Sequence, residues 1–529
     1  AKKLWLENIP PVILEDEIEK KYGYSSSKYQ VEAILGEYDA PSQQKQGILT
    51  YNFLNDGNTI IYGNDSSESE MLLDSIIYST TKNHTSDEIN YYIVDYGSES
   101  LRKYDKLPHI GDMVFIGEDE RYNNLLKLLK KEILKRKKIL SDFGGEYKNY
   151  IKNSGKKMPI IVVIMNNFDS ISDSNQNVLE ELPDMVRDTE RYGVIYILTA
   201  TGTRSVYSKI LQNFSNYYAF KLNDISDYME VFSQRNKIYP RDFLGRGICK
   251  LEDLYEFQAC SIVKNFDDLN VYIDDFIKQQ QTIEQTRAKK IPVLPEYVRF
   301  NYIEEEISDI KNIPVAVSKA ELEIQKINIL QDNGCLISSN KLINTNVFVK
   351  SLLKIFSRIK NISIIIIDAP NQLELSSAIF PNYYTSKFDE VIANINTYIK
   401  NLIQSNSSQE GIILINGIGK LVTKLDNKLL LNDLMDNVKK YEKIGVFGVE
   451  ELNKIKQYTY EAWFTNVFSI NSGIWIGRGL SDQSLFRIST ITKEMMNNIP
   501  NSMGYLINDN FALAVKFIDF VTQEEENGK

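Results

Sequence analysis

The chain has 529 residues, which is too long for one compact core and suits two to four domains. Its 43% hydrophobic and 25% charged residues lie in the globular range, so the composition excludes wholesale disorder. A net charge of −10 argues against a surface that coats duplex DNA, and we expect no nucleic-acid partner. Three cysteines without a CxxC pair and only two histidines make a metal site hard to assemble, so none is predicted.

The beginning of the chain, AKKLWLENIPPVI, lacks the apolar stretch of a signal peptide. No run of about 18 uninterrupted apolar residues occurs in the sequence, so we expect no transmembrane helix in it. The absence of an initial methionine suggests an excised part of a longer protein, whose remainder can be bound to a membrane.

Short runs rich in valine and isoleucine alternate with helix-length segments, which is typical of parallel strands joined by helical crossovers. In the first half the runs are residues 59–62, 91–94, 159–165 and 194–199, followed by a strand that ends near residues 245–247. In the second half they are residues 335–338, 362–367, 411–415, 445–449 and 473–476. We therefore predict an α/β protein with two tandem domains, each a mostly parallel sheet flanked by helices.

The polar ends of the predicted strands repeat between the halves. Asp95 and Asp368 end the second run of each half, and Asn166 and Asn416 end the third. This spacing indicates a duplication rather than one large irregular α/β domain. The polar stretch KQQQTIEQTRAKK before IPVLPEYV marks a linker, so the predicted domains are residues 1–285 and 286–529.

A phosphate-binding loop of the GxxxxGK[ST] type is expected between the first strand and the next helix. Gly63 supplies its leading glycine, but Glu68 replaces the second glycine, Ser69 the lysine and Glu70 the magnesium-binding Ser/Thr. The missing lysine removes a contact of about 1.5–3 kcal/mol, and a carboxylate about 4 Å from a phosphate adds repulsion of roughly 4 kcal/mol. We expect Glu68 and Glu70 to stabilise the helix dipole instead.

The corresponding loop of the second half, residues 339–346, retains no position of the pattern unaltered. Lys341 is a displaced cation that could contact a phosphate, whereas Asn344 and Thr345 suit helix N-caps. The other positions of this loop that we single out are Ser339 and Asn346.

A Walker-B strand normally ends in an aspartate that holds magnesium. Here the third strand of each half ends in neutral amides, Asn166 with Asn167 and then Asn416. Amides cannot fully replace that charge. We therefore expect no cofactor, with ATP and Mg²⁺ as cofactors only if the loops prove functional.

Seven segments together carry a resemblance to a known family. They are LWLENIPPVI (4–13), YYIVDYGSESL (91–101), KLPHIGDMV (106–114), RYGVIYILTATGTR (191–204), LGRG (244–247), IPVLPEYV (291–298) and GIWIGRGLSDQSLF (473–486). Through their order and spacing, the chain resembles the last two ATPase-like domains of EssC/EccC coupling proteins, the FtsK/SpoIIIE-type ATPases of type VII secretion. The resemblance implies two RecA-like P-loop NTPase domains.

The resemblance also implies a setting and partners. The chain would be the cytosolic part of a membrane-anchored motor of a Gram-positive bacterium, at the cytoplasmic face of the membrane. Its partners would be the upstream ATPase and membrane domains of the same protein, in a ring-like assembly. Its substrates would be secreted Trp-Xaa-Gly helical-hairpin proteins and effectors. The family's nucleotide positions fall on residues 63–70, 166, 339–346 and 416, most of which depart from the pattern, so ATP turnover is doubtful.

Two further sets of side chains are candidates for function. Arg204, Arg246 and Arg478 lie near predicted strand ends, where an arginine could reach a neighbouring domain's nucleotide, although a local ion pair is the commoner role. An export signal is expected to bind an apolar pocket in helix-in-groove fashion. The candidate liners are Trp463, Phe464, Phe468 and Trp475, with core packing as the alternative.

Three hypotheses follow. The first is a recognition and regulatory module of a secretion motor with degenerate nucleotide loops. The second is an active ATPase, completed by Lys341 or by a neighbouring subunit's arginine, which micromolar ATP affinity would support. The third is a DNA translocase fragment, which rests on fold likeness alone.

Overall fold

The computed structural model describes residues 6–174, 176–235, 238–284, 286–331 and 333–520. The chain forms two compact units, Ala1–Pro292 and Val293–Lys529. The boundary predicted after residue 285 falls just before this division. The intervening residues belong to the first unit, where the backbone N–H of Ala288 donates to the carbonyl of Pro108 at 2.9 Å.

The first unit is built on a ten-stranded sheet of order β2-β1-β10-β9-β8-β3-β7-β6-β4-β5. Its parallel part consists of β8 (Asn216–Ala219), β3 (Thr59–Tyr62), β7 (Val194–Ala200), β6 (Ile160–Asn166), β4 (Ile89–Asp95) and β5 (Ile110–Phe115). The antiparallel part consists of β9 (Arg246–Lys250), β10 (Leu254–Ala259), β1 (Glu32–Ala40) and β2 (Lys45–Asn52). The longer helices are α1 (Glu15–Tyr22), α3 (Ser66–Asn83), α4 (Asp119–Leu140), α5 (Tyr147–Ser154), α7 (Gln176–Val186), α9 (Ile225–Phe232) and α10 (Leu269–Ile283).

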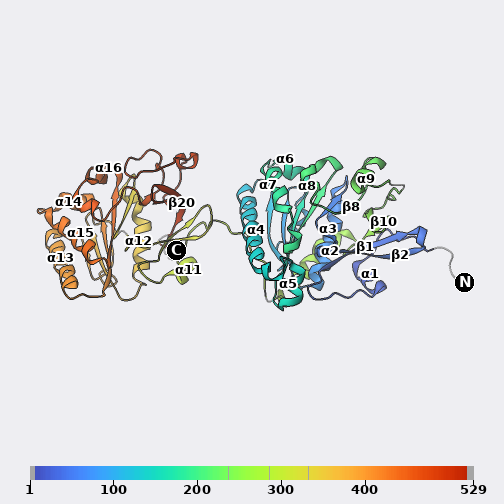
Figure 1. Cartoon of the computed structure of the whole chain (residues 1–529), viewed down its shortest axis with the longest axis horizontal. Coiled ribbons are helices and arrows are strands. Elements are labelled where there is room, and N and C mark those ends of the chain that lie inside the picture. The colour runs from blue at the N-terminus through green and yellow to red at the C-terminus, as the bar shows by residue number, and fades with distance from the viewer. Residues whose placement is uncertain (1–5, 175, 236–237, 285, 332, 521–529) are drawn as a thin grey trace. The chain divides into compact units, whose positions relative to one another are not determined.

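The second unit is coloured from yellow-green to red in Figure 1. It repeats this sheet with every strand label raised by ten, in the order β12-β11-β20-β19-β18-β13-β17-β16-β14-β15. Its parallel strands are β18 (Gly473–Ile476), β13 (Gly334–Ser339), β17 (Ile444–Glu451), β16 (Glu410–Asn416), β14 (Ile362–Asp368) and β15 (Tyr383–Tyr384). Its antiparallel strands are β19 (Met503–Asn508), β20 (Phe511–Phe517), β11 (Ile313–Ser318) and β12 (Ile324–Ile327). The helices include α12 (Asn346–Phe356), α13 (Phe388–Gln404), α14 (Ile418–Lys424) and α15 (Leu429–Tyr441).

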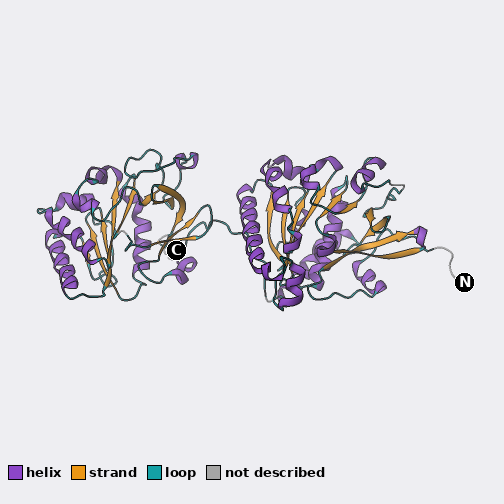
Figure 2. Cartoon of the chain, in the orientation of Figure 1, coloured by secondary structure: helices purple, strands orange, loops and turns teal. Residues whose placement is uncertain are grey.

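The predicted fold class is confirmed, and helices flank both sheets (Figure 2). Strands β3, β4, β6 and β7 are buried along their whole length, as expected of parallel strands covered on both faces. Two apolar clusters in each unit form the corresponding cores. Among the described residues, no helix has the length and apolar character that a bilayer span requires.

One predicted strand is wrong. The strand expected to end near residues 245–247 instead begins there, because β9 starts at Arg246 and runs antiparallel to β8. The similar glycine–arginine–glycine sequence at 477–479 follows β18, which corresponds to β8. Residues 477–479 therefore begin the connection from β18 to β19, whereas residues 245–247 lie at the end of the connection from β8 to β9. The two motifs are not at equivalent positions.

Candidate functional site

The loop from β3 to α3 is held by the protein's own groups. Asp65 caps α3, since its carboxylate accepts the backbone N–H of Ser67 at 2.9 Å. Glu68 is buried, and its carboxylate accepts the backbone N–H of Lys221 at 3.4 Å. Burial raises the pKa of the Glu68 carboxyl, and its backbone hydrogen bonds oppose that shift. A carboxylate thus already occupies backbone donors at this edge of the sheet.

The neighbouring positions of the same loop supply neither a cationic side chain for a phosphate nor, at the Ser/Thr position, a hydroxyl ligand for magnesium. Ser69, at the lysine position, is buried, and its hydroxyl oxygen lies 3.2 Å from where a Cβ on Gly63 would be. Glu70, at the Ser/Thr position, accepts the hydroxyl of Ser98 at 2.6 Å. The residues present do not fit Mg²⁺-bound ATP in the usual way, because carboxylates stand where phosphate needs a cation.

The loop from β13 to α12 is closed differently. The Ser339 hydroxyl donates to the carbonyl of Lys341 at 2.6 Å, and the backbone N–H of Leu342 donates to Glu451 at 3.2 Å. Glu451 ends β17 and also pairs with Lys454 at 3.2 Å. A carboxylate from a neighbouring strand therefore binds a loop N–H here as well, while the Lys341 side chain is exposed.

The expected N-caps of α12 are only partly observed. Thr345 stands at the N-cap position, but its hydroxyl donates back to the carbonyl of Leu342 at 2.7 Å instead of accepting a helix N–H. Asn344 lies inside the short 3₁₀ turn Leu342–Thr345, and Asn346 begins α12. The capping prediction is therefore wrong in its chemistry, because the 3₁₀ turn precedes the helix.

The strand-end asparagines pair with the strand-end aspartates, a pairing that the sequence analysis did not predict. In the first unit Asn166 donates to Asp95 at 3.1 Å and accepts the Thr199 hydroxyl at 2.7 Å. In the second unit Asn416 donates to Asp368 at 2.8 Å. Each pair joins adjacent parallel strands at their last register positions. The repeated spacing of these residues was the available signal, because neighbouring parallel strands end at the same edge.

The carboxylates of these pairs are satisfied within the protein. Asp95 is fully buried and also accepts the backbone N–H of Gly97 at 3.1 Å, and burial raises its pKa. Asp368 accepts the N–H of Leu373 at 2.8 Å and the hydroxyl of Tyr383 at 2.9 Å. Burial and this carboxylate raise the pKa of Tyr383 to about 12. Asn167 has a φ of 57° and donates its N–H to the Thr199 hydroxyl at 2.7 Å.

The three candidate arginines separate into two kinds. Arg204 and Arg478 are exposed, and Arg478 donates to Asn498 at 3.5 Å. Arg246 is not available to a neighbouring nucleotide, because its guanidinium is buried and donates to Gln258 at 2.9 Å and to the carbonyl of Ile9 at 3.0 Å. The proposed finger role of Arg246 is therefore wrong, since that side chain ties the N-terminal segment to β9.

The aromatic candidates for a substrate pocket are core residues. Trp463, Phe464, Phe468 and Trp475 are 4%, 1%, 5% and 0% exposed and belong to one apolar cluster. The Trp475 indole N–H donates to the carbonyl of Arg478 at 3.2 Å. These rings present no surface to an incoming peptide, so the pocket has to be sought elsewhere.

A groove beside β4 and β5 of the first unit holds the end of that unit's own chain, residues 286–291. The Tyr92 hydroxyl donates to the carbonyl of Lys289 at 2.7 Å, and Ile291 is 3% exposed within the cluster that includes Tyr92 and Leu125. A Cβ on Gly111 would lie 2.8 Å from the Lys289 carbonyl oxygen and 2.4 Å from the Tyr92 ring. The close approach of this segment, which we call the connector, thus requires glycine on β5.

The second unit is open at the equivalent place. Asp95 and Asp368 end β4 and β14 at matching register positions, so Tyr92 corresponds to Ile365. Beside Ile365 lies a cavity of about 340 Å³. Its apolar liners come from β14, β15 and α13: Ile365, Tyr384, Val391, Ile395 and Tyr398. We call it the β15–α13 groove. The sequence could not predict this groove, because it depends on whether the tertiary fold places a chain segment beside β14, as it does beside β4.

Comparisons with known proteins agree with this architecture. Residues 24–236 match the FtsK/SpoIIIE family. The type VII secretion system protein EssC of Staphylococcus aureus (strain Mu50) is 25% identical over 346 residues, which cover 63% of this chain and 23% of that protein. The ESX secretion system protein YukB of Bacillus subtilis is 27% identical over 263 residues, 49% of this chain and 18% of that protein. The chain thus spans about a quarter of the length of such relatives.

Two solved structures share the whole fold. ATPases 2 and 3 of EssC from Geobacillus thermodenitrificans align with a TM-score of 0.82 at 20% identity, over 97% of this chain and 100% of that one. ATPases 2 and 3 of Thermomonospora curvata EccC, in complex with a signal sequence peptide, align with a TM-score of 0.56 at 14% identity, over 94% and 95%. The chain therefore has the fold of these tandem ATPase domains. More particularly, its sequence is similar to the FtsK/SpoIIIE family over residues 24–236 and to EssC-type proteins over a longer stretch.

Proposed function

We propose that this chain is the substrate-recognition part of a type VII protein-secretion motor, and that the β15–α13 groove of its second unit holds an apolar anchor of the exported protein. The carrying observation is the contrast between two equivalent grooves, one occupied by the connector and one open. The connector supplies an example of what fits such a groove, namely a backbone carbonyl accepting from a strand side chain and one buried isoleucine.

The relatives support this assignment by what their names state. The EccC structure with the same fold contains a signal sequence peptide, and the curated relatives are proteins of type VII or ESX secretion. We therefore propose helical-hairpin export substrates as partners, with upstream ATPase and membrane domains in the same protein. The region would act at the cytoplasmic face of the membrane within a ring-like assembly.

Nucleotide turnover by these two units forms no part of the proposal. Glu68 and Glu451 occupy backbone N–H groups near the two loops, and the Walker-B positions are amides bound to aspartates. Calorimetric titration of the whole chain with Mg²⁺ and ATP should show no binding below about 1 mM. Micromolar affinity at either loop would instead support an active ATPase.

The groove is tested with a labelled peptide that carries the export signal of a Trp-Xaa-Gly hairpin substrate. Tyr398→Glu places a charge in the groove and should weaken binding to the full chain at least tenfold, because an unpaired carboxylate in an apolar groove loses solvation. Lys400→Glu, on the exposed opposite face of α13, is the control and should change affinity less than twofold despite its larger change of charge. Equal effects of the two variants would remove the groove from the proposal.

A further inference from the structure

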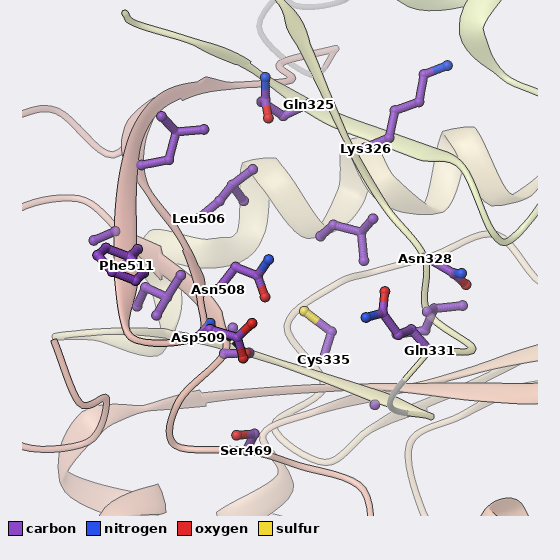
Figure 3. Close-up of a pocket in the computed structure, with 18 residues that line it drawn as sticks. Gln325, Lys326, Asn328, Gln331, Cys335, Ser469, Leu506, Asn508, Asp509 and Phe511 are labelled. Carbon is purple, nitrogen blue, oxygen red and sulfur yellow. Dashed lines mark hydrogen bonds between the residues drawn. The ribbon is translucent and has the colours of Figure 1, made fainter. Parts of the chain in front are cut away.

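A second cavity of the second unit, of about 650 Å³, lies where β13 and β18 begin, at the edge of the sheet opposite the nucleotide-type loop that follows β13. Figure 3 shows the residues that line it. It is formed by the segment that follows β12, the beginnings of β13 and β18, and the turn between β19 and β20. Ile327, Ile329 and Leu513 supply apolar wall, and Gln331, Asn508 and Asp509 stand exposed around it. We call it the β12–β19 pocket.

The internal repeat identifies what fills the same space in the first unit. The hairpin register pairs Ala33 with Tyr51 in the first unit and Ile313 with Ile327 in the second. Both hairpins carry a register shift after the next pair. Tyr51 and Phe53 therefore correspond to Ile327 and Ile329.

The neighbouring strands support this equivalence. Ile61 pairs with Thr199 on β7 and Tyr218 on β8, and Ile337 pairs with Val449 on β17 and Ile474 on β18. Ten positions separate Tyr51 from Ile61, as they separate Ile327 from Ile337. Two rings of the first unit are thus replaced by two isoleucines in the second.

The first unit shows how rings pack there. Tyr51 and Phe53 are fully buried with ring centroids 4.5 Å apart, and the Tyr51 hydroxyl donates to the carbonyl of Gly57 at 2.7 Å. The occupied space thus takes aromatic rings together with one phenolic hydrogen bond. In the second unit, amide and carboxylate groups at Gln331, Asn508 and Asp509 can accept an equivalent hydroxyl.

We propose that the β12–β19 pocket binds a phenol ring, supplied either by a small phenol or by a tyrosine side chain of a polypeptide. An apolar cavity of about 150 Å³ is enough for a benzene ring, and ligand pockets span about 300–1,000 Å³. The pocket can therefore hold the ring together with the groups that flank it. This inference does not depend on the β15–α13 groove, which is lined by different residues.

The first test uses the Cys335 thiol, which lines the pocket, as a reporter (Figure 3). p-Cresol at millimolar concentration should slow the labelling of Cys335 by a small maleimide at least fivefold. Cys249 and Cys260 are 0% and 1% exposed and should stay unlabelled throughout. A parallel titration with acetyl-Gly-Tyr-Gly-amide, against acetyl-Gly-Ala-Gly-amide, distinguishes a tyrosine side chain from a small phenol. Protection by neither p-cresol nor the tyrosine peptide would overturn the proposal.

The second test restores the first unit's residues. Ile327→Tyr and Ile329→Phe should each weaken p-cresol binding, measured by calorimetry on the full chain, at least tenfold because the space is filled. Ile491→Tyr, at a half-exposed position outside the pocket, is the matched control and should leave affinity unchanged. Tyr398→Glu should also leave p-cresol binding unchanged, which separates this proposal from the groove.

The third test guards against variants that fail to fold. A crystal of the unaltered chain soaked with p-cresol should show the ring against Ile327 and Ile329. A ring bound elsewhere, or unchanged affinity in a folded Ile329→Phe variant, would contradict the assignment.

Discussion

The two units share one order of ten strands, yet they fill it differently. The first unit closes its groove with the connector and packs the space between its hairpin and β3 with Tyr51 and Phe53. The second leaves a cavity at each of the equivalent places. The sheet topology alone therefore does not determine whether such a unit has cavities at these places, because a few side chains and one connecting segment decide it.

The units agree in one polar feature, the aspartate–asparagine pair at the ends of neighbouring strands. Its surroundings differ, since Asp368 accepts from the Tyr383 hydroxyl, whereas Asp95 receives backbone N–H groups at 3.1 and 3.5 Å. The two asparagines should therefore differ in how much they stabilise their units.

We expect the largest effect from removal of the asparagines. Asn166→Leu should cost about 3 kcal/mol of unfolding free energy, because fully buried Asp95 loses its amide donor and the Thr199 hydroxyl loses its acceptor. Asn416→Leu should cost about 1.5 kcal/mol, because Asp368 keeps two strong donors. Urea unfolding followed by hydrogen exchange in each unit measures both, and equal costs would contradict the distinction.

The next effect concerns the connector. Ile291→Ala should destabilise the docked connector by about 2 kcal/mol. This value is at the lower end of the range for truncating a buried isoleucine to alanine, because the segment lies at the edge of the core. Faster amide exchange over residues 286–291 is the readout. Val293→Ala, at a position 54% exposed, should leave that exchange unchanged, and slow exchange in both variants would show that Ile291 does not hold the segment.

The smallest effect is the pH dependence that His109 contributes in the first unit, which contains both histidines. Burial lowers the pKa of His109, so the unfolded chain binds a proton below about pH 6.5 that the folded chain does not. The contribution of His109 to stability should therefore fall as pH drops below that value, by at most about 1.4 kcal/mol per pH unit. Burial raises the pKa of the Glu15 carboxyl to about 7, which acts in the opposite direction, so the effect of His109 is read from the difference between the unaltered chain and His109→Gln. The measurement is urea unfolding at several pH values.

A second group extends the same trend to lower pH. Burial alone would raise the pKa of Glu88, but hydrogen bonds from His84, Thr85 and Tyr29 lower it to about 2. The stability that Glu88 contributes is fully present above its unfolded pKa of about 4.3 and is lost as pH falls toward 2. His109→Gln should flatten the profile near pH 6 and leave the acid limb intact, whereas an unchanged profile would exclude His109 as the source.

The sequence predicted the buried parallel strands well, because continuous Val/Ile runs such as residues 160–165 have few other interpretations. It missed the parallel strands β5 and β8, as well as β15, which is only Tyr383–Tyr384. It also missed the hairpin strands, whose alternation is weak. Arg246 was expected at the end of a strand, whereas β9 begins there and runs antiparallel to β8.

The site was less predictable than the fold. Glu68 and Glu70 were recognised as breaks in the loop pattern, but the role of Glu451 required the neighbouring strand. Trp475 was a candidate pocket liner with core packing as the alternative, and it is a core residue. Cavities arise where tertiary contacts are missing. Only the comparison of equivalent positions, such as Tyr51 with Ile327, makes them interpretable.

Gly111 offers a simple route between the two kinds of groove. A methyl group there would meet both the Tyr92 ring and the carbonyl that this tyrosine's hydroxyl binds, so one codon change could release the connector without altering the sheet. Duplicated domains of this architecture can therefore exchange a self-occupied state for a receptive one in a single evolutionary step.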